Sequence, residues 1–371
     1  MSEASSSTLE LIDYLVSYAG LISLATISIY AGSFASLKLP KSKSTRSPDK
    51  DYEDEDEGLS EEIRLEDAYW LPILGSVVLF SLYIIIRYIS VKWINIVLQW
   101  YFSIITVASL WTASRNFMRF CLGTTRWRQL RPLTLSITHG DQPLVHLRTP
   151  TITLFLLPFV LYPSIVYIFF PSIMESQHAV LINIMGLSLT HTALVSIKLD
   201  SLITGVVLLS GLFLYDIWWV FGSKPVFGSN VMVTVAQGLD APIKILFPKS
   251  RHLLGNDYTM LGLGDIVVPG MFIAFALRYD LHRSAVKDLG QRFAKPFFIA
   301  TLISYIVGLA TTVVVMHTFH SAQPALLYLS PACILSFLAT GLIYGEWAEI
   351  WAYSDTQEEQ NVAGDQKEKV D

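Results

Sequence analysis

The chain has 371 residues, of which 52% are apolar and only 15% are charged, and its formal net charge is −5 at pH 7. Soluble domains carry nearer 25% charged residues, so this composition excludes an ordinary soluble protein. The apolar residues come in runs of about 20, the length with which a helix crosses a bilayer. A β-barrel would show short alternating segments instead. The sequence therefore predicts an all-α, polytopic membrane protein.

Nine apolar stretches are long enough to be transmembrane helices. They lie at about 11–37, 68–89, 93–113, 150–172, 178–197, 201–222, 261–278, 296–317 and 322–344. We divide the chain into an N-terminal segment with the first helix, an acidic loop with the composition of a disordered linker, helices two to five, a core of helices six to nine, and a polar C-terminal tail. These five regions are residues 1–37, 38–67, 68–197, 198–345 and 346–371.

The distribution of Lys and Arg predicts the orientation of these helices. With the N-terminus in the lumen, 20 of the 26 basic residues fall on the cytosolic side. Basic residues are retained preferentially on the cytosolic side of membrane proteins. We therefore expect a lumenal N-terminus and, after nine crossings, a cytosolic C-terminus.

Two aspartates lie inside membrane-length apolar stretches, Asp216 in the sixth and Asp265 near the start of the seventh. A carboxylate in hydrocarbon costs roughly 3 kcal/mol on insertion scales, so residues of this kind indicate function. The two stretches are consecutive and antiparallel, which places both aspartates about 6–8 Å from the same interface. Two facing carboxyl groups can share one proton and activate a water molecule.

The residues around Asp265 favour an open backbone at this point. Gly262 and Gly264 have no side chain, so a neighbouring chain can approach closely. Pro269 has no N–H, which leaves the carbonyl of Asp265, four residues earlier, without its usual helical partner. Such a backbone is tolerated in a membrane only where it lines water or protein.

Three short motifs on three predicted helices resemble the signatures of the intramembrane aspartyl proteases, the group that contains presenilin and signal peptide peptidase. They are Tyr215-Asp216, Gly262-Leu263-Gly264-Asp265 and Pro324-Ala325-Leu326. The similarity to signal peptide peptidase is closer and covers roughly residues 180–345. It is carried by the stretches 211–222, 230–236, 240–244 and 323–329. The segment 223–229 departs from the family pattern by being longer.

The resemblance implies an aspartic endopeptidase that cuts transmembrane helices, above all remnant signal peptides and type II membrane proteins in the endoplasmic reticulum. Asp216 and Asp265 would be the catalytic pair, with one of them protonated. The residues expected to shape the active site and hold the substrate are Tyr215, Gly262, Leu263, Gly264, Pro324, Ala325 and Leu326. Because a helix must unwind before it is cut, we expect strand-like pairing of the substrate near Gly262–Asp265 and Pro324–Leu326.

The expected partners are helical peptide substrates and the lipid bilayer, with no nucleic acid and no metal or organic cofactor. A homo-oligomer and partners from degradation pathways are both compatible with the sequence. Lys367 and Lys369, the fifth and third residues from the C-terminus, resemble a dilysine retrieval signal of the endoplasmic reticulum.

Two other functions remain open at this point. A presenilin-type protease would share the motifs but have the opposite orientation, accessory subunits and a large loop between the two aspartate helices. A proton-coupled transporter would also keep intramembrane aspartates but would cleave no peptide bond.

Overall fold

The computed structural model describes residues 3–37, 61–88, 91–127, 132–139, 142–170, 175–228, 231–239, 241–249, 258–284, 293–319 and 323–355. Lys367, Lys369 and most of the acidic loop lie outside these residues.

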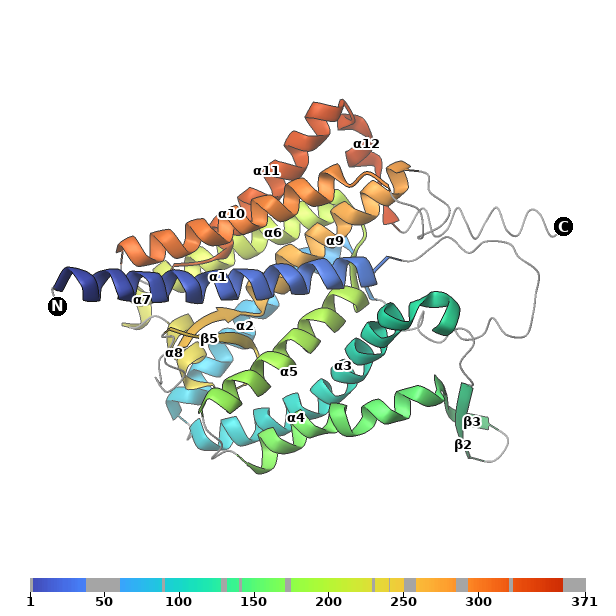
Figure 1. Ribbon diagram of the computed structural model, residues 1–371. Helices are drawn as coiled ribbons and strands as arrows, with labels where there is room; N and C mark the ends of the chain where they lie inside the picture. Colours follow the sequence, from blue (N-terminus) through green and yellow to red (C-terminus); the bar gives the residue numbers. More distant parts are fainter. Residues whose placement is uncertain are drawn as a thin grey trace.

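Long helices build the described part of the chain, as Figure 1 shows. They are α1 Glu3–Ala35, α2 Leu65–Tyr88, α3 Val91–Trp127, α4 Leu157–Phe169, α5 Glu175–Ser196, α6 Leu202–Ile217, α9 Gly264–Ser284, α10 Pro296–Phe319 and α11 Leu326–Tyr344. The short helices are η3 Thr151–Leu156, η4 Trp218–Gly222 (a π-helix), α7 Ser223–Phe227, α8 Val231–Gly238 and α12 Trp347–Ala352. The predicted all-α, polytopic fold is confirmed.

Three two-stranded sheets complete the described structure. Strand β1 Glu61–Ile63 runs parallel to β4 Ile197–Leu199. Strand β2 Pro132–His139 is antiparallel to β3 Gln142–Pro150. Strand β5 Lys244–Pro248 is antiparallel to β6 Tyr258–Gly262, which leads directly into α9.

Each of the nine stretches predicted to cross the membrane contains a helix. Among the described residues, seven helices are long and apolar enough to span a bilayer by themselves. The helix α4 is too short, with 13 residues, and α9 carries Asp265, Arg278, Asp280 and Arg283. The count of nine crossings therefore stays a prediction.

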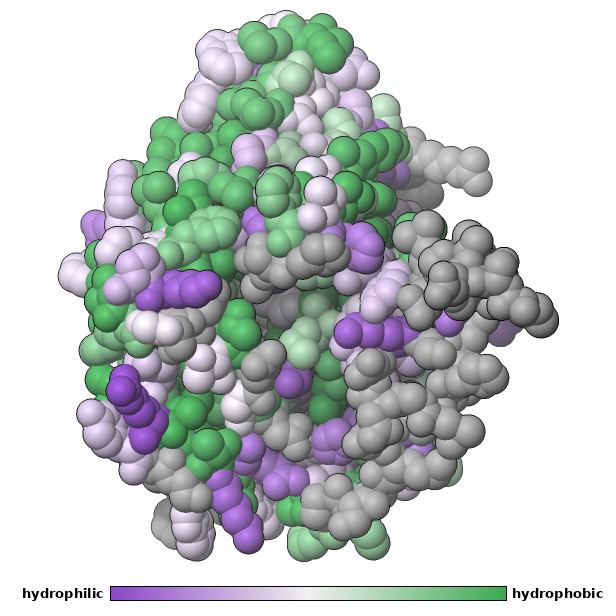
Figure 2. Space-filling view, turned by 90° about the vertical axis from the view of Figure 1, so that its left-hand side faces the viewer, coloured by the Kyte–Doolittle hydropathy of each residue, from purple (hydrophilic) through white to green (hydrophobic). Residues whose placement is uncertain are grey.

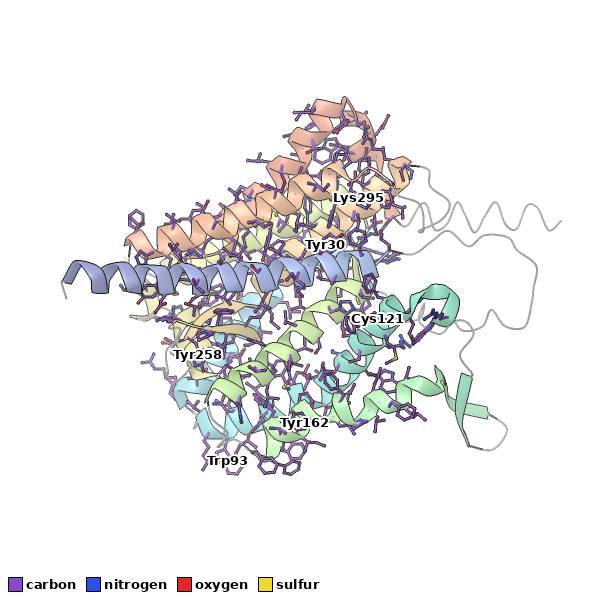
Figure 3. All side chains as sticks on the ribbon, in the orientation of Figure 1. Tyr30, Trp93, Cys121, Tyr162, Tyr258 and Lys295 are labelled. Atoms are coloured by element: carbon purple, nitrogen blue, oxygen red, sulfur yellow. The ribbon has the colours of Figure 1, made fainter. Side chains whose placement is uncertain are left out.

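Helix α9 lies at the centre of the bundle. Every residue from Pro269 to Asp280 is buried, and α1, α5, α6, α10 and α11 all contact this helix. The outer helices instead expose large apolar side chains, among them Trp93 and Tyr162, which project from the lower edge in Figure 3. Viewed from the end at which α1 begins, apolar residues cover the upper part of the molecule and polar residues gather in the middle and lower part (Figure 2). The centre of the bundle is thus the helix that carries Asp265.

Several boundaries differ from those predicted. Helix α3 continues to Trp127, with a kink at Gly123, although the third span was expected to end at 113. Its polar extension is held by tertiary contact, because Asn116 Nδ2 lies 3.3 Å from His191 Nε2 of α5. The strand β1 lies in the loop that was expected to be disordered, and α12 lies in the expected tail. For α3 and β1, contact with distant segments orders residues whose composition is polar.

One end of the molecule joins four segments that are far apart in the sequence. The pairing of β1 with β4 brings the start of α2 to the turn between α5 and α6. After α11 the chain returns to this turn, where the Asp355 N–H donates to the Asp200 carbonyl at 2.9 Å. The Asp355 carboxylate also pairs with Arg278 of α9 at 2.5 Å. These segments are the ones that the charge distribution assigns to the cytosolic side.

The predicted orientation can be tested with glycosylation acceptors. An acceptor inserted within residues 1–8 should be modified in microsomes, because that segment is expected in the lumen. An acceptor inserted after residue 356 should stay unmodified. The reverse pattern would contradict the orientation and favour the presenilin-type arrangement.

Candidate active site

Asp216 lies in α6 with only 2% of its surface exposed. Its Oδ2 accepts a hydrogen bond of 3.0 Å from the backbone N–H of Leu326, the first residue of α11. The first N–H groups of a helix have no partner within the helix and attract negative charge. Asp216 therefore occupies the place of an N-cap for a helix 110 residues away in the sequence.

Asp265 is the second residue of α9 and is partly exposed, while the preceding Gly264 is exposed. Its carboxyl group interacts electrostatically with that of Asp216, and α6 contacts α9. The structure thus brings together the two aspartates that the sequence singled out. Asp216 forms the closed side of the pair, and Asp265 forms the side that water or another chain can reach.

Asp216 does not lie as close to the end of its helix as the sequence predicted. Asp216 was predicted about five residues from the end of its helix, but the helical path continues without a break from Leu202 to Phe227. Asp216 therefore lies about 16 Å from that end at 1.5 Å per residue. The pair still meets because α11 begins at the buried Leu326, beside Asp216, and α6 packs on α9. The hairpin β5–β6 supplies the chain that leads into α9.

Tyr305 of α10 is a residue of this site that the sequence reasoning missed. Its side chain is completely buried, and its hydroxyl donates to the backbone carbonyl of Asp265 at 3.3 Å. This is the carbonyl that Pro269 leaves without a helical partner. A membrane-embedded tyrosine was a visible signal, but only the packing of α10 on α9 shows which carbonyl it reaches.

Helix α10 also fixes α11, the third helix of the site. Ser304 Oγ, next to Tyr305, donates to the Ala332 carbonyl of α11 at 2.7 Å. Helix α10 thus binds both the backbone of Asp265 and helix α11. The N-terminus of α11 in turn binds Asp216. The relative position of the two carboxyl groups depends on this connection.

The motif around Asp265 continues the hairpin. The Leu263 N–H donates to the Ile243 carbonyl at 2.9 Å, so pairing extends past Gly262. A side-chain carbon on Gly262 would lie 3.4 Å from Asp265 Oδ2. A side-chain carbon on Gly264 would meet no atom of the described residues within 4 Å. Gly262 is therefore the glycine that lies against Asp265, and Gly264 faces open space.

The other predicted site residues lie around the pair. Pro324 and Ala325 form the turn that opens α11, where the Pro324 carbonyl accepts from the Leu327 N–H at 3.3 Å. The ring of Tyr215 packs near Trp219, with a centroid distance of 6.5 Å, and against Gly75 of α2. In the part of the chain that is described, no hydrogen bond joins Tyr215 to either aspartate. Packing between α2 and α6 is the role that its contacts show.

Metal-binding side chains are not grouped in the described residues, where no three His, Cys, Asp or Glu residues lie close enough to hold an ion. The site offers two carboxyl groups and a backbone N–H donor for chemistry, and its face beside Gly264 is open.

A helical membrane protein with two interacting aspartates is the architecture expected of a protease that works inside the bilayer. The chain matches the family model described as signal peptide peptidase over residues 55–357. It is 32% identical to the signal peptide peptidases of Mus musculus and Homo sapiens over 346 residues, which cover 92% of this chain and 84% of each relative. It is 38% identical to intramembrane protease 2 of Caenorhabditis elegans over 204 residues, 53% of this chain and 42% of that protein. The chain belongs to the signal peptide peptidase family and is an intramembrane protease.

Tyr305→Phe should lower the cleavage rate about tenfold, the effect of losing one buried hydrogen bond of about 1.4 kcal/mol from a group that must stay in position. The change keeps the ring and removes only the hydroxyl. In a Pro269→Ala background the residue at 269 regains an N–H that can bind the Asp265 carbonyl. The loss from Tyr305→Phe should then be smaller. Steady-state cleavage by the four proteins of this double-mutant cycle measures the coupling, and additive effects would contradict it.

Gly264→Val should strongly lower cleavage while leaving the thermal unfolding midpoint unchanged, because the new side chain fills open space beside Asp265 and displaces no atom. Gly262→Val is the matched comparison, since its side chain would contact Asp265 itself. Cleavage assays and thermal unfolding of both purified variants give the result. Near-normal turnover by Gly264→Val would show that the open space is not on the substrate path.

Proposed function

We propose that the protein is an aspartic endopeptidase in which Asp216 and Asp265 are the catalytic acid–base pair. The observation that carries this proposal is the meeting of three motifs at one point. Asp216 of α6 interacts with Asp265 of α9 and is held by the Leu326 N–H of α11. Two carboxyl groups that interact in this way cannot both be ionised cheaply, so they share one proton.

The hydrogen-bonding pattern assigns a role to each carboxyl group. A backbone N–H donor stabilises a carboxylate in its charged form, so we assign Asp216 as the ionised member and Asp265 as the protonated one. Asp216 takes a proton from water as its oxygen attacks the scissile carbonyl carbon. Asp265 gives its proton to the carbonyl oxygen. The resulting diol collapses when the proton on Asp216 passes to the amide nitrogen, one diol hydroxyl returns its proton to Asp265, and the C–N bond breaks.

The open face of the pair suits a substrate that arrives from the bilayer. Gly264 is exposed, and Asp265 is the more accessible of the two aspartates. A transmembrane helix has its backbone carbonyls in hydrogen bonds, so the segment to be cut must first unwind. Strand β6 ends at Gly262, three residues before Asp265, and offers an unwound segment a backbone edge with which to pair.

Remnant signal peptides and type II membrane proteins in the endoplasmic reticulum are the substrates that we infer from the family. The same resemblance supports a multi-pass protein of that membrane with its N-terminus in the lumen, its C-terminus in the cytosol, and Lys367 and Lys369 as a retrieval signal. The match to signal peptide peptidase disfavours the presenilin-type alternative. Membership in a protease family leaves the transporter alternative without support.

Asp216→Asn and Asp265→Asn should each reduce cleavage of a synthetic signal-peptide helix to below about 1% of wild type, and the double variant should be little worse, as expected for residues that act as a unit. Stability should change little, because a neutral amide is easier to desolvate than a carboxylate. Mass spectrometry of the products from purified protein measures the effect. A correctly inserted single variant that keeps more than a few per cent of the activity would show the dyad mechanism to be wrong.

A further inference from the structure

Asn183 of α5 binds both backbone polar groups of one strand residue. Its Nδ2 donates to the Leu246 carbonyl at 2.7 Å, and its Oδ1 accepts from the Leu246 N–H at 2.7 Å. This is the pair of hydrogen bonds that a residue on a neighbouring strand would make. A single side chain thus takes the place of a third strand beside β5.

The register of the hairpin shows that these bonds lie on the edge of β5 that faces away from β6. Antiparallel pairs alternate between hydrogen-bonded and non-hydrogen-bonded positions. The bond from Leu263 N–H to the Ile243 carbonyl makes Ile245↔Leu261 and Phe247↔Thr259 the hydrogen-bonded pairs. The backbone groups of Leu246 and Pro248 therefore point away from β6.

Helix α1 closes the remaining part of this edge. Pro248 has no N–H to offer, and its carbonyl accepts from Ser17 Oγ at 2.6 Å. Ser17 is buried, and its hydroxyl also lies 2.9 Å from the Asp13 carbonyl of its own helix. One turn along α5 from Asn183, a side-chain carbon on Gly186 would lie 3.5 Å from the Pro242 carbonyl and from Leu263. Strand β5 of the hairpin is thus hydrogen-bonded to α5 and α1.

The opposite edge of the hairpin is open in the described structure. By the same alternation, the backbone groups of Met260 and Gly262 point away from β5. Met260 is 49% exposed. The only atom of the described residues near a side-chain carbon on Gly262 would be Oδ2 of Asp265. Tyr258, at the start of β6, is labelled in Figure 3.

We propose that Asn183, assisted by Ser17, is a positioning residue that fixes β5 on α5 and α1, so that β6 presents its free edge to an extended substrate in one register relative to Asp265. The inference rests on the proposed function and adds the group that sets the cleavage position. Strand pairing can slip by two residues without changing which side chains face the sheet. A slip of two residues moves the substrate by about 6.8 Å, which brings a different peptide bond to the dyad.

Removing the amide should therefore change where the substrate is cut as well as how fast. The experiment compares the purified full-length wild type with Asn183→Ala, on a synthetic signal-peptide helix, with the product ends determined by mass spectrometry. We expect Asn183→Ala to lower kcat/KM about tenfold, the effect of about 1.4 kcal/mol of lost hydrogen bonding, and to produce new ends beside the main one. Asn183→Asp keeps the acceptor and loses the donor, so its product distribution should lie between the two.

Ser188→Ala is the matched control. Ser188 is buried on the same helix, but its hydroxyl donates within α5, to the Met185 carbonyl at 2.7 Å. Its product ends should equal those of wild type. A general loosening of α5 would affect both positions, whereas loss of the edge contact affects only Asn183.

The outcomes separate the inference from the function on which it rests. If wild type leaves the helix uncut, the proposed function fails. If wild type cuts and Asn183→Ala gives the same ends in the same ratio, the positioning role is overturned while the protease assignment stands. If Asn183→Ala does not accumulate, Asn183→Asp and Ser17→Ala decide the matter, and unchanged product ends in both would overturn the proposal.

Discussion

The bond between the Leu326 N–H and the Asp216 carboxylate is the interaction on which the site depends. It joins two groups that would each be unfavourable alone in the interior, a buried carboxylate and the unpaired start of a helix. Because the bond links α6 to α11, it also sets where α11 begins. The Pro324-Ala325-Leu326 segment therefore contacts the aspartate pair through a backbone N–H.

The same requirement for partners explains the rest of the site. A helix that begins inside a membrane protein leaves backbone groups that lipid cannot satisfy. Tyr305 supplies a donor for the carbonyl that Pro269 leaves unpaired, and Asn183 supplies both partners for Leu246 at the strand edge. Each of these side chains comes from a different helix around α9. The surrounding helices thus position the backbone groups of the site by supplying their hydrogen-bond partners. The face beside Gly264 stays open.

Individual residues show how much of this was accessible from the sequence. The aspartates stood out because charge inside an apolar stretch is unfavourable, and Pro269 predicted an unpaired carbonyl four residues earlier. The partner of that carbonyl was not predictable, because Tyr305 is 40 residues away and only helix packing brings it there. The depth of Asp216 was misjudged because hydropathy does not show that the helical path from Leu202 continues to Phe227. The polar ends of α3 and the strand β1 were misjudged because their order comes from contacts with α5 and β4.

Asp216 and Asp265 are proposed to hold the tetrahedral state of a peptide bond jointly. Binding of a helical peptide in which a diol replaces the scissile carbonyl measures this without any turnover. We expect tight binding to the wild-type protein and loss of binding in both Asp216→Asn and Asp265→Asn, with either variant still binding the parent peptide. Equal affinity of the diol peptide for the wild type and for either variant would contradict it.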